Sequence, residues 1–148
     1  MCPTALALHY KTGNLVGNID YFYTTDKSEG DFYTWQAVQG YCSSAAVFGI
    51  PMAPLYRLYL LSAYDHLFTV KEEIANAAMN DGYQLEGKPC FVITDPAGLL
   101  PAQYKESHLM RKDTSNRLGD ADQKDRLVAD GWTDLGVDHY LFTQPTCD

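Results

Sequence analysis

An internal repeat of roughly 46 residues is the feature that most constrains the fold of this chain. A tyrosine followed by a basic residue occurs three times, at Tyr10–Lys11, Tyr56–Arg57 and Tyr104–Lys105. Each pair is followed, in the same order, by a glycine before an aromatic residue and then by a short apolar run. The glycine–aromatic pairs are Gly40–Tyr41, Gly82–Tyr83 and Gly131–Trp132. This shared order predicts one domain over residues 1–148, made of three diverged units at approximately 4–52, 53–99 and 100–148.

The middle unit shows most clearly which secondary structure to expect. Residues 56–60 alternate in type and residues 65–70 are rich in aromatic and β-branched side chains, so both segments are predicted to be strands. Residues 71–82 predict a helix, with Thr69 as its N-cap and two acidic residues in its first turn. Two further strands complete a β-β-α-β-β unit. The corresponding helices are expected at 123–131 in the third unit and at 31–40, an aromatic segment, in the first.

Three units of similar length favour a closed fold. Each unit is too small to bury its own apolar faces, and closure removes exposed sheet edges. We therefore predict an α+β, β-rich fold with three β-β-α-β-β repeats in a closed pseudo-threefold arrangement; the alternative is a β-trefoil-like all-β fold. Closure also predicts that residues 4–10 run beside residues 139–143 and bring Cys2 and Cys147 together. The expected core residues are Ile74, Ala78, Phe91, Ile93, Leu127, Val128, Leu141, Phe48 and Leu58.

Composition excludes several classes of protein. The formal net charge of −8 opposes association with nucleic acid phosphates and with anionic membranes. Residues 1–10 lack the pattern of a secretory signal and no apolar run approaches the roughly 20 residues of a membrane span, so a cytoplasmic location and no membrane partner are predicted. The four cysteines include no CxxC pair, which argues against a zinc site and favours buried or unreactive thiols. No cofactor is predicted.

The first candidate site is a set of aromatic and charged residues in the middle unit, with a corresponding set in the first unit. Sugar-binding sites use this mixture, because aromatic faces pack on sugar C–H groups while charged side chains hydrogen-bond the hydroxyls. The candidate ligand-binding residues are Tyr56, Arg57, Asp65 and His66 in the middle unit and Tyr10, Lys11, Asp20 and Tyr21 in the first unit. Asp65 and His66 are both expected within reach of Arg57. The alternative is that these residues serve the core and the turns of each unit.

The third unit suggests a different chemistry. Basic residues are concentrated there, and an acidic run follows them directly. Such a loop could hold a phosphodiester and a divalent cation, with a histidine as general acid or base. The candidate catalytic residues are His108, Asp120, Asp122 and Lys105, with Asp120 and Asp122 as the candidate metal ligands. The alternative is a solvated loop in which one of the aspartates serves the helix dipole.

The segment from residue 55 to residue 94 resembles a known family of repeats. It contains LYRLYL, DHLFT, Gly82–Tyr83 and Glu86–Gly87 in that order, which is similar to the domain family of unknown function DUF5648. The likeness extends over the chain as three units, although SNRLG at 115–119 stands where DHLFT is expected. The resemblance implies a family of bacterial and fungal proteins that often lies beside secreted enzymes, and therefore a binding module rather than a catalyst.

These observations lead to three competing interpretations. The preferred hypothesis is a lectin-like module that binds a glycan or another small polar ligand, in a cytoplasmic fungal defence protein. The alternative hypothesis is a metal-dependent ribonuclease of the ribotoxin type, with RNA as its partner and its site in the diverged third unit. A third, plainer interpretation is an interaction domain without a small ligand. A binding site should recur in the first two units, whereas a catalytic site should occur once.

Overall fold

The structure is a computed structural model that describes residues 3–12 and 18–145. Antiparallel strands predominate in these residues, and three pairs of consecutive strands form hairpins. The hairpins are β1–β2 (Thr4–Thr12 and Ile19–Thr24), β5–β6 (Tyr56–Leu60 and Asp65–Thr69) and β9–β10 (Tyr104–Lys112 and Ser115–Gly119). The other strands are β3 (Thr34–Cys42), β4 (Met52–Pro54), β7 (Gln84–Gly87), β8 (Phe91–Ile93) and β11 (Thr133–Phe142).

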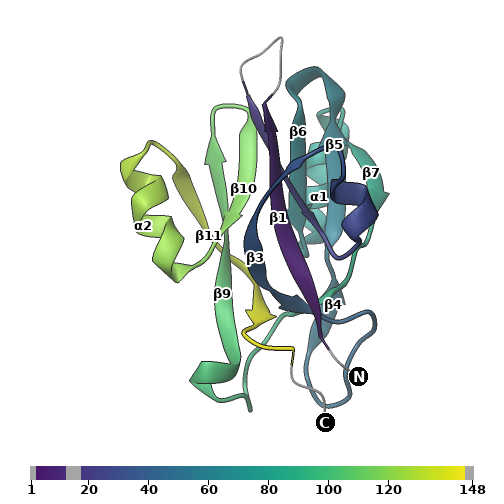
Figure 1. Cartoon of the computed structure of the whole chain (residues 1–148), viewed down its shortest axis with the longest axis vertical. Helices are drawn as coiled ribbons and strands as arrows, with labels where there is room; N and C mark the ends of the chain where they lie inside the picture. Colours follow the sequence, from purple (N-terminus) through teal and green to yellow (C-terminus); the bar gives the residue numbers. More distant parts are fainter. Residues whose placement is uncertain (1–2, 13–17, 146–148) are drawn as a thin grey trace.

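The strands of the described residues form two sheets (Figure 1). The larger sheet has eight strands: its main path is β10-β9-β11-β3-β1-β2, with β8 paired to β11 and β4 paired to β8. The smaller sheet has the order β6-β5-β7. The larger sheet curls, so that its two end strands, β10 and β2, contact each other and both contact β6. This curl covers edges that an open sheet would expose.

The predicted closed pseudo-threefold arrangement is wrong. The first and third units contribute their hairpins to one curled sheet, whereas the hairpin of residues 53–99 belongs to a separate sheet. The units also differ in content, because the helix predicted at 31–40 is replaced by β3, preceded by the short 3₁₀ helix Lys27–Gly30. Trp35 and Val38 in this segment are types that favour a strand. The β-trefoil-like all-β alternative is wrong as well, because the described residues include two α-helices.

The two α-helices confirm the predictions made for the second and third units. They are α1 (Glu72–Asn80) and α2 (Ala121–Ala129). The predicted N-cap of α1 is wrong: Lys71 occupies that position without a side-chain hydrogen bond, and the Thr69 hydroxyl instead accepts from the Lys71 N–H at 3.1 Å. At α2, by contrast, Asp120 and Gln123 form a capping box. No helix in the described part of the chain is long and apolar enough to cross a membrane.

Strand β3 separates the first strand of the chain from the last one. Ala5 of β1 pairs with Tyr41 on one side of β3, and Phe142 of β11 pairs with Tyr41 on the other side. The prediction that residues 4–10 lie directly beside residues 139–143 is therefore wrong, although the ends of β1 and β11 flank the same part of β3. The predicted approach of Cys2 and Cys147 lies outside the described residues.

The core lies between the two sheets, where the second strands of the hairpins meet. Tyr23 of β2 is fully buried, donates a hydrogen bond to the Leu118 carbonyl at 3.1 Å and accepts one from the Leu118 N–H at 3.0 Å. Phe68 of β6 packs edge-on against Tyr23, with ring centroids 5.1 Å apart. Among the predicted core residues, Leu58, Ala78, Ile93, Leu127 and Leu141 are buried, Ile74 and Phe91 are half-buried, and Val128 and Phe48 are exposed, contrary to expectation.

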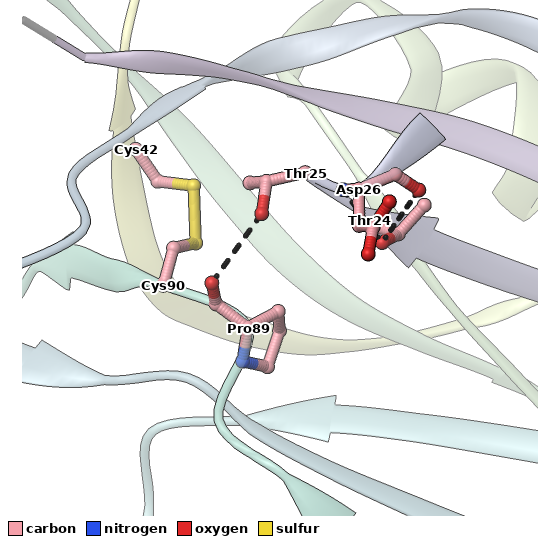
Figure 2. The surroundings of a disulfide bond; sticks show 6 residues. All are labelled: Thr24, Thr25, Asp26, Cys42, Pro89 and Cys90. Atoms are coloured by element: carbon pink, nitrogen blue, oxygen red, sulfur yellow. Dashed lines mark hydrogen bonds between the residues drawn. A yellow bond between two sulfur atoms is a disulfide. The ribbon is translucent and has the colours of Figure 1, made fainter. Parts of the chain in front are cut away.

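A disulfide bond joins Cys42, at the end of β3, to Cys90, directly before β8 (Figure 2). Both side chains are buried, and their Cα atoms lie 6.0 Å apart. The prediction of unreactive thiols is therefore wrong for this pair, which the fold brings together across a sequence separation of 48. Beside the bond, the Thr25 hydroxyl donates to the Pro89 carbonyl at 3.5 Å, as Figure 2 shows. These contacts tie β3 and the segment after β2 to the chain that enters β8.

Candidate functional site

His66, one of the predicted ligand-binding residues, lies buried in β6 with both ring nitrogens bound to carboxylates. Its Nδ1 is 2.8 Å from Asp20 Oδ2, and its Nε2 is 2.8 Å from Glu86 Oε1. The rings of Tyr59 and Phe22 pack against it, with centroids 4.4 and 4.9 Å away. Asp20 comes from β2 and Glu86 from β7, so the histidine links the two sheets.

Arg57 extends this cluster toward the surface. Its guanidinium donates two hydrogen bonds of 3.1 Å to the two carboxylate oxygens of Glu29, a bidentate geometry. Its Nε lies 3.2 Å from Glu86 Oε1, an ion-pair contact without the alignment of a hydrogen bond. The guanidinium carbon also lies 5.1 Å from the centre of the Phe22 ring, which is a cation–π distance. Arg57 and His66 thus share Glu86, which the sequence did not predict, and His66 lies near Arg57 as expected.

The electrostatics of this cluster favour a charged histidine. Burial by itself lowers the pKa of His66, but the carboxylates of Asp20 and Glu86 outweigh burial and raise that pKa above the usual value. In return, the hydrogen bond from His66 lowers the pKa of Glu86, against the effect of its partial burial. The positive charge of the His66 imidazolium is therefore balanced by two carboxylates, one at each ring nitrogen. Because its nitrogens are both occupied within the protein, the cluster acts as a cross-link between β2, β6 and β7.

Asp65 does not join this cluster. Its side chain is fully buried on the other face of β6, where it accepts hydrogen bonds from the Asn116 N–H and side-chain amide, each at 2.7 Å, and from the Tyr83 hydroxyl. Burial raises the pKa of Asp65 to about 6, although the hydrogen bonds from Tyr83 and Asn116 oppose that shift. Asp65 therefore connects β6 to β10 in the core, and the expected contact with Arg57 is not formed.

The remaining candidates of the first two units lie apart from the His66 cluster or at its margin. Tyr56 is half-buried, its hydroxyl donates to Glu72 Oε1 at 3.4 Å, and Lys88 lies over its ring. Tyr10 pairs with Tyr21, and Lys11 with Asp20, in the β1–β2 ladder. The Lys11 ammonium lies 5.8 Å from the centre of the Tyr33 ring.

The third-unit candidates occupy structural positions at the start of α2 and on β9. Asp120 caps α2 through its Oδ1, and its Oδ2 accepts from the Lys105 ammonium at 3.2 Å. His108 is buried between Asp134, 3.0 Å from its Nδ1, and Glu106, 2.9 Å from its Nε2. Asp122 is exposed in the first turn of α2. Residues 3–12 and 18–145 contain no group of three or more metal-ligating side chains that could hold an ion.

A pocket of about 230 Å³ lies between β2, the β9–β10 turn and the start of β11. Tyr21 and Trp132 form its aromatic part, with ring centroids 5.8 Å apart in an edge-to-face arrangement. The other residues that line it are Asn18, Ile19, Lys112, Asp113 and Ser115. Tyr21 is the one predicted site residue that lines this pocket, where its neighbours differ from Tyr10, Lys11 and Asp20, the residues with which the sequence grouped it.

Two side chains of the pocket wall are held in place by the fold. The Asn18 amide donates to the Ala63 carbonyl at 2.8 Å and to the Thr114 hydroxyl at 2.7 Å. The Lys112 ammonium donates to the Asp130 carbonyl at 2.7 Å. A wall whose polar groups are anchored in this way needs little reordering when a ligand enters, which favours binding.

Sequence reasoning missed most of this pocket. The sequence identified Trp132 only as the aromatic partner of Gly131 in the repeat, and it gave no signal at the loop residues Asn18 and Asp113. The one usable signal was the glycine–aromatic position, where the third unit has tryptophan and the other two have tyrosine. A half-buried tryptophan next to a diverged hairpin is a reasonable marker of a binding surface.

The fold and the pocket define a β-rich domain in which a curled sheet packs on a smaller one beside an aromatic and polar recess. The chain belongs to the family described as Domain of unknown function (DUF5648), whose model matches residues 16–142. The family assignment made from the sequence is thus confirmed, while the division into three equivalent tandem units is not. No curated protein matches the chain, and no solved structure matches it either.

Proposed function

We propose that this domain is a binding module for a saccharide or a similar small polar ligand, which occupies the pocket beside Tyr21 and Trp132. The observation that carries the proposal is the combination of two aromatic rings with hydroxyl, ammonium and carboxylate groups in one recess. Saccharides present apolar C–H faces and hydroxyl groups on the same ring, so they require this mixture.

The size of the pocket agrees with a small ligand. Pockets for drug-sized molecules measure roughly 300–1,000 Å³, whereas this one measures about 230 Å³. One sugar ring at the end of a chain is a suitable occupant, because the rest of the saccharide can extend into solvent. Affinity for a single ring should be modest, and several linked modules would increase it through avidity.

The cluster around His66 is a less suitable binding site, because its polar groups have their partners within the protein. Its charged groups are bound to one another, and His66 and Asp20 are buried. The ribonuclease hypothesis has no specific observation in its favour, because Asp120 caps a helix and both nitrogens of His108 are bound to carboxylates. Binding at the pocket is therefore the function that we carry forward.

Tryptophan fluorescence provides a direct test. The chain contains two tryptophans, Trp132 at the pocket and Trp35, which is 60 % exposed on β3 and outside the pocket lining. In a Trp35→Phe background, a panel of monosaccharides and oligosaccharides should include members that change the Trp132 emission in a saturable way. Trp132→Ala should abolish binding of the same ligand, measured by calorimetry, and Trp35→Ala should leave its affinity unchanged.

The opposite result is equally informative. If Trp132→Ala, with its melting profile intact, bound the ligand as well as Trp35→Ala does, the pocket would not be the binding site. A panel in which no saccharide changes the Trp132 signal at millimolar concentration would contradict the proposal as a whole.

The Cys42–Cys90 disulfide supports a working environment different from the cytoplasm expected from the sequence. Cytosolic reductants keep protein thiols reduced, whereas buried structural disulfides persist in oxidising compartments. We accordingly propose that the domain works in an oxidising environment. Rapid alkylation of the protein in its host, followed by peptide mapping, should find Cys42 and Cys90 protected; alkylated Cys90 in the native protein would contradict this.

A further inference from the structure

The charge around the pocket differs in sign from that of the whole chain. Arg117 of β10 is 7 % exposed, and its guanidinium carbon lies 4.5 Å from the centre of the Tyr21 ring. Its Nε donates to the Leu118 carbonyl at 3.1 Å. Within the described residues, no carboxylate lies at ion-pair distance from this guanidinium. A nearly buried cation without an acidic partner costs free energy, and it is unexpected in a protein of net charge −8. We therefore ask which anion it could attract.

Lys112 places a second positive charge at the pocket itself. The hydrogen bond from its ammonium to the Asp130 carbonyl fixes its position but leaves its charge uncompensated, because a carbonyl is neutral. In the part of the chain that the structure describes, this ammonium also forms no ion pair with a carboxylate. An ammonium group has three N–H donors, so donors remain for a ligand after one is used.

Asp113 contributes a negative charge to the same pocket. The conformation of the turn explains why an aspartate occupies this position. It occupies the two-residue turn between β9 and β10 with φ of 54°, in the left-handed region. Aspartate and asparagine adopt this conformation more readily than other residues with side chains. Its side chain is exposed, so water screens its charge more than that of the nearly buried Arg117. The balance at the pocket is therefore positive.

Ser115 adds a neutral hydrogen-bonding group. It lines the pocket, is 7 % exposed, and its hydroxyl forms no side-chain hydrogen bond within residues 3–12 and 18–145. A nearly buried hydroxyl loses free energy if it stays unpaired, so a ligand oxygen is its natural partner. The pocket thus presents an aromatic surface, a hydroxyl and a fixed ammonium next to one another.

We infer that the ligand is an acidic saccharide, with a sugar ring against Trp132 and a carboxylate facing Lys112. This inference rests on the proposed function and narrows it to one class of sugar, of which hexuronic acids are the simplest members. Lys112 is the residue that recognises the carboxylate. Arg117 is a positioning residue: its guanidinium lies over the Tyr21 ring and adds positive potential near the pocket.

The experiment compares a charged sugar with a neutral one, and it uses two variants that change the charge at the pocket in opposite directions. Calorimetric or NMR titrations of the full chain with glucuronate, glucose and acetate, at low ionic strength, should show that glucuronate binds about tenfold more tightly than glucose and that acetate binds weakly. Lys112→Gln should reduce the affinity for glucuronate about tenfold and the affinity for glucose much less, so that the ratio of the two affinities falls. Asp113→Asn, which retains the turn conformation, should raise the affinity for glucuronate several-fold. Lys88→Gln, a lysine near Tyr56, is the charge-matched control.

The outcomes separate the inference from the proposed function. If glucose and glucuronate bind equally and neither variant changes their ratio, the acidic-sugar inference is overturned while binding at the pocket stands. Equal binding of acetate and glucuronate also overturns the inference, because the sugar ring then contributes nothing. If no sugar perturbs Trp132 in any of these titrations, the proposed function itself has failed.

Discussion

Removal of the Cys42–Cys90 disulfide should lower the free energy of unfolding by about 4 kcal/mol. The bond spans a sequence separation of 48. In the chain-entropy model, a cross-link over a loop of that length removes about 14 cal/mol/K from the unfolded chain, which corresponds to about 4 kcal/mol at 25 °C. For a domain of this size each kcal/mol shifts the melting temperature by about 2–4 °C, so a decrease of about 8–16 °C is expected.

Urea unfolding of three samples measures this effect. The samples are the oxidised wild type, the wild type reduced with a phosphine, and the double variant Cys42→Ala/Cys90→Ala. The reduced protein and the double variant should both show lower midpoints and a steeper dependence of the unfolding free energy on urea, because their unfolded chains expose more surface. Peptide mapping after alkylation verifies the state of the two cysteines in each sample.

A specific result would refute this reasoning. If oxidised and reduced wild type unfold at the same urea concentration, while mapping confirms that the bond is present in one and absent in the other, the loop constraint does not stabilise the fold. The chain segments joined by Cys42 and Cys90 would then have to be associated in the unfolded protein as well.

Three further predictions concern stability. His66→Gln should destabilise the protein most at low pH. Burial lowers the pKa of His66, but Asp20 and Glu86 outweigh burial and raise that pKa in the folded protein. The stabilisation of the folded protein by charged His66 is therefore complete below the ordinary histidine pKa of about 6.5, and it is lost as the pH rises through the higher pKa of the folded state. Unfolding curves from pH 5 to 9 check this, and a difference that grows with pH would contradict it. Phe68→Ala should cost about 3–5 kcal/mol in denaturant unfolding, since Phe68 is 2 % exposed in the core; a midpoint near that of the wild type would show that the core is wrongly assigned. Asp120→Ala should cost about 1 kcal/mol through loss of the α2 cap, whereas the exposed Asp122→Ala should cost less; equal effects would exclude the capping box as the cause.

The His66 cluster shows how far local reasoning reaches in a strand. The sequence correctly placed Arg57 and His66 near one another, because β5 and β6 form a hairpin and Tyr59 pairs with His66. It wrongly added Asp65 to the same site. Successive residues of a strand point to opposite faces, so Asp65 and His66 cannot both lie on the face of Arg57. The alternation itself was readable from the sequence, whereas the carboxylates that replace Asp65, from Asp20 and Glu86, come from other strands.

The segment at 31–40 illustrates the opposite failure. Its position in the repeat predicted a helix, but its residues form β3, which lies between β1 and β11 in the larger sheet. The position of the segment in the repeat pattern did not indicate the environment in which it lies. Aromatic and β-branched side chains fit a pleated surface between two other strands, and those strands come from opposite ends of the chain.

The sequence by itself determined the strands of the middle unit and the two α-helices, and also the acidic charge and the membership in the family. These strands and helices depend on the periodicity of apolar residues and on contacts between residues close together in the chain, so their patterns are visible in the sequence. Only the tertiary structure decided how the strands divide into two sheets, that Cys42 meets Cys90, and that Tyr21 meets Trp132. Each of these depends on which strand edges pair and how the larger sheet curls. The pairing of strand edges depends on burial and hydrogen bonding between residues far apart in the chain, so it cannot be predicted from a local sequence pattern.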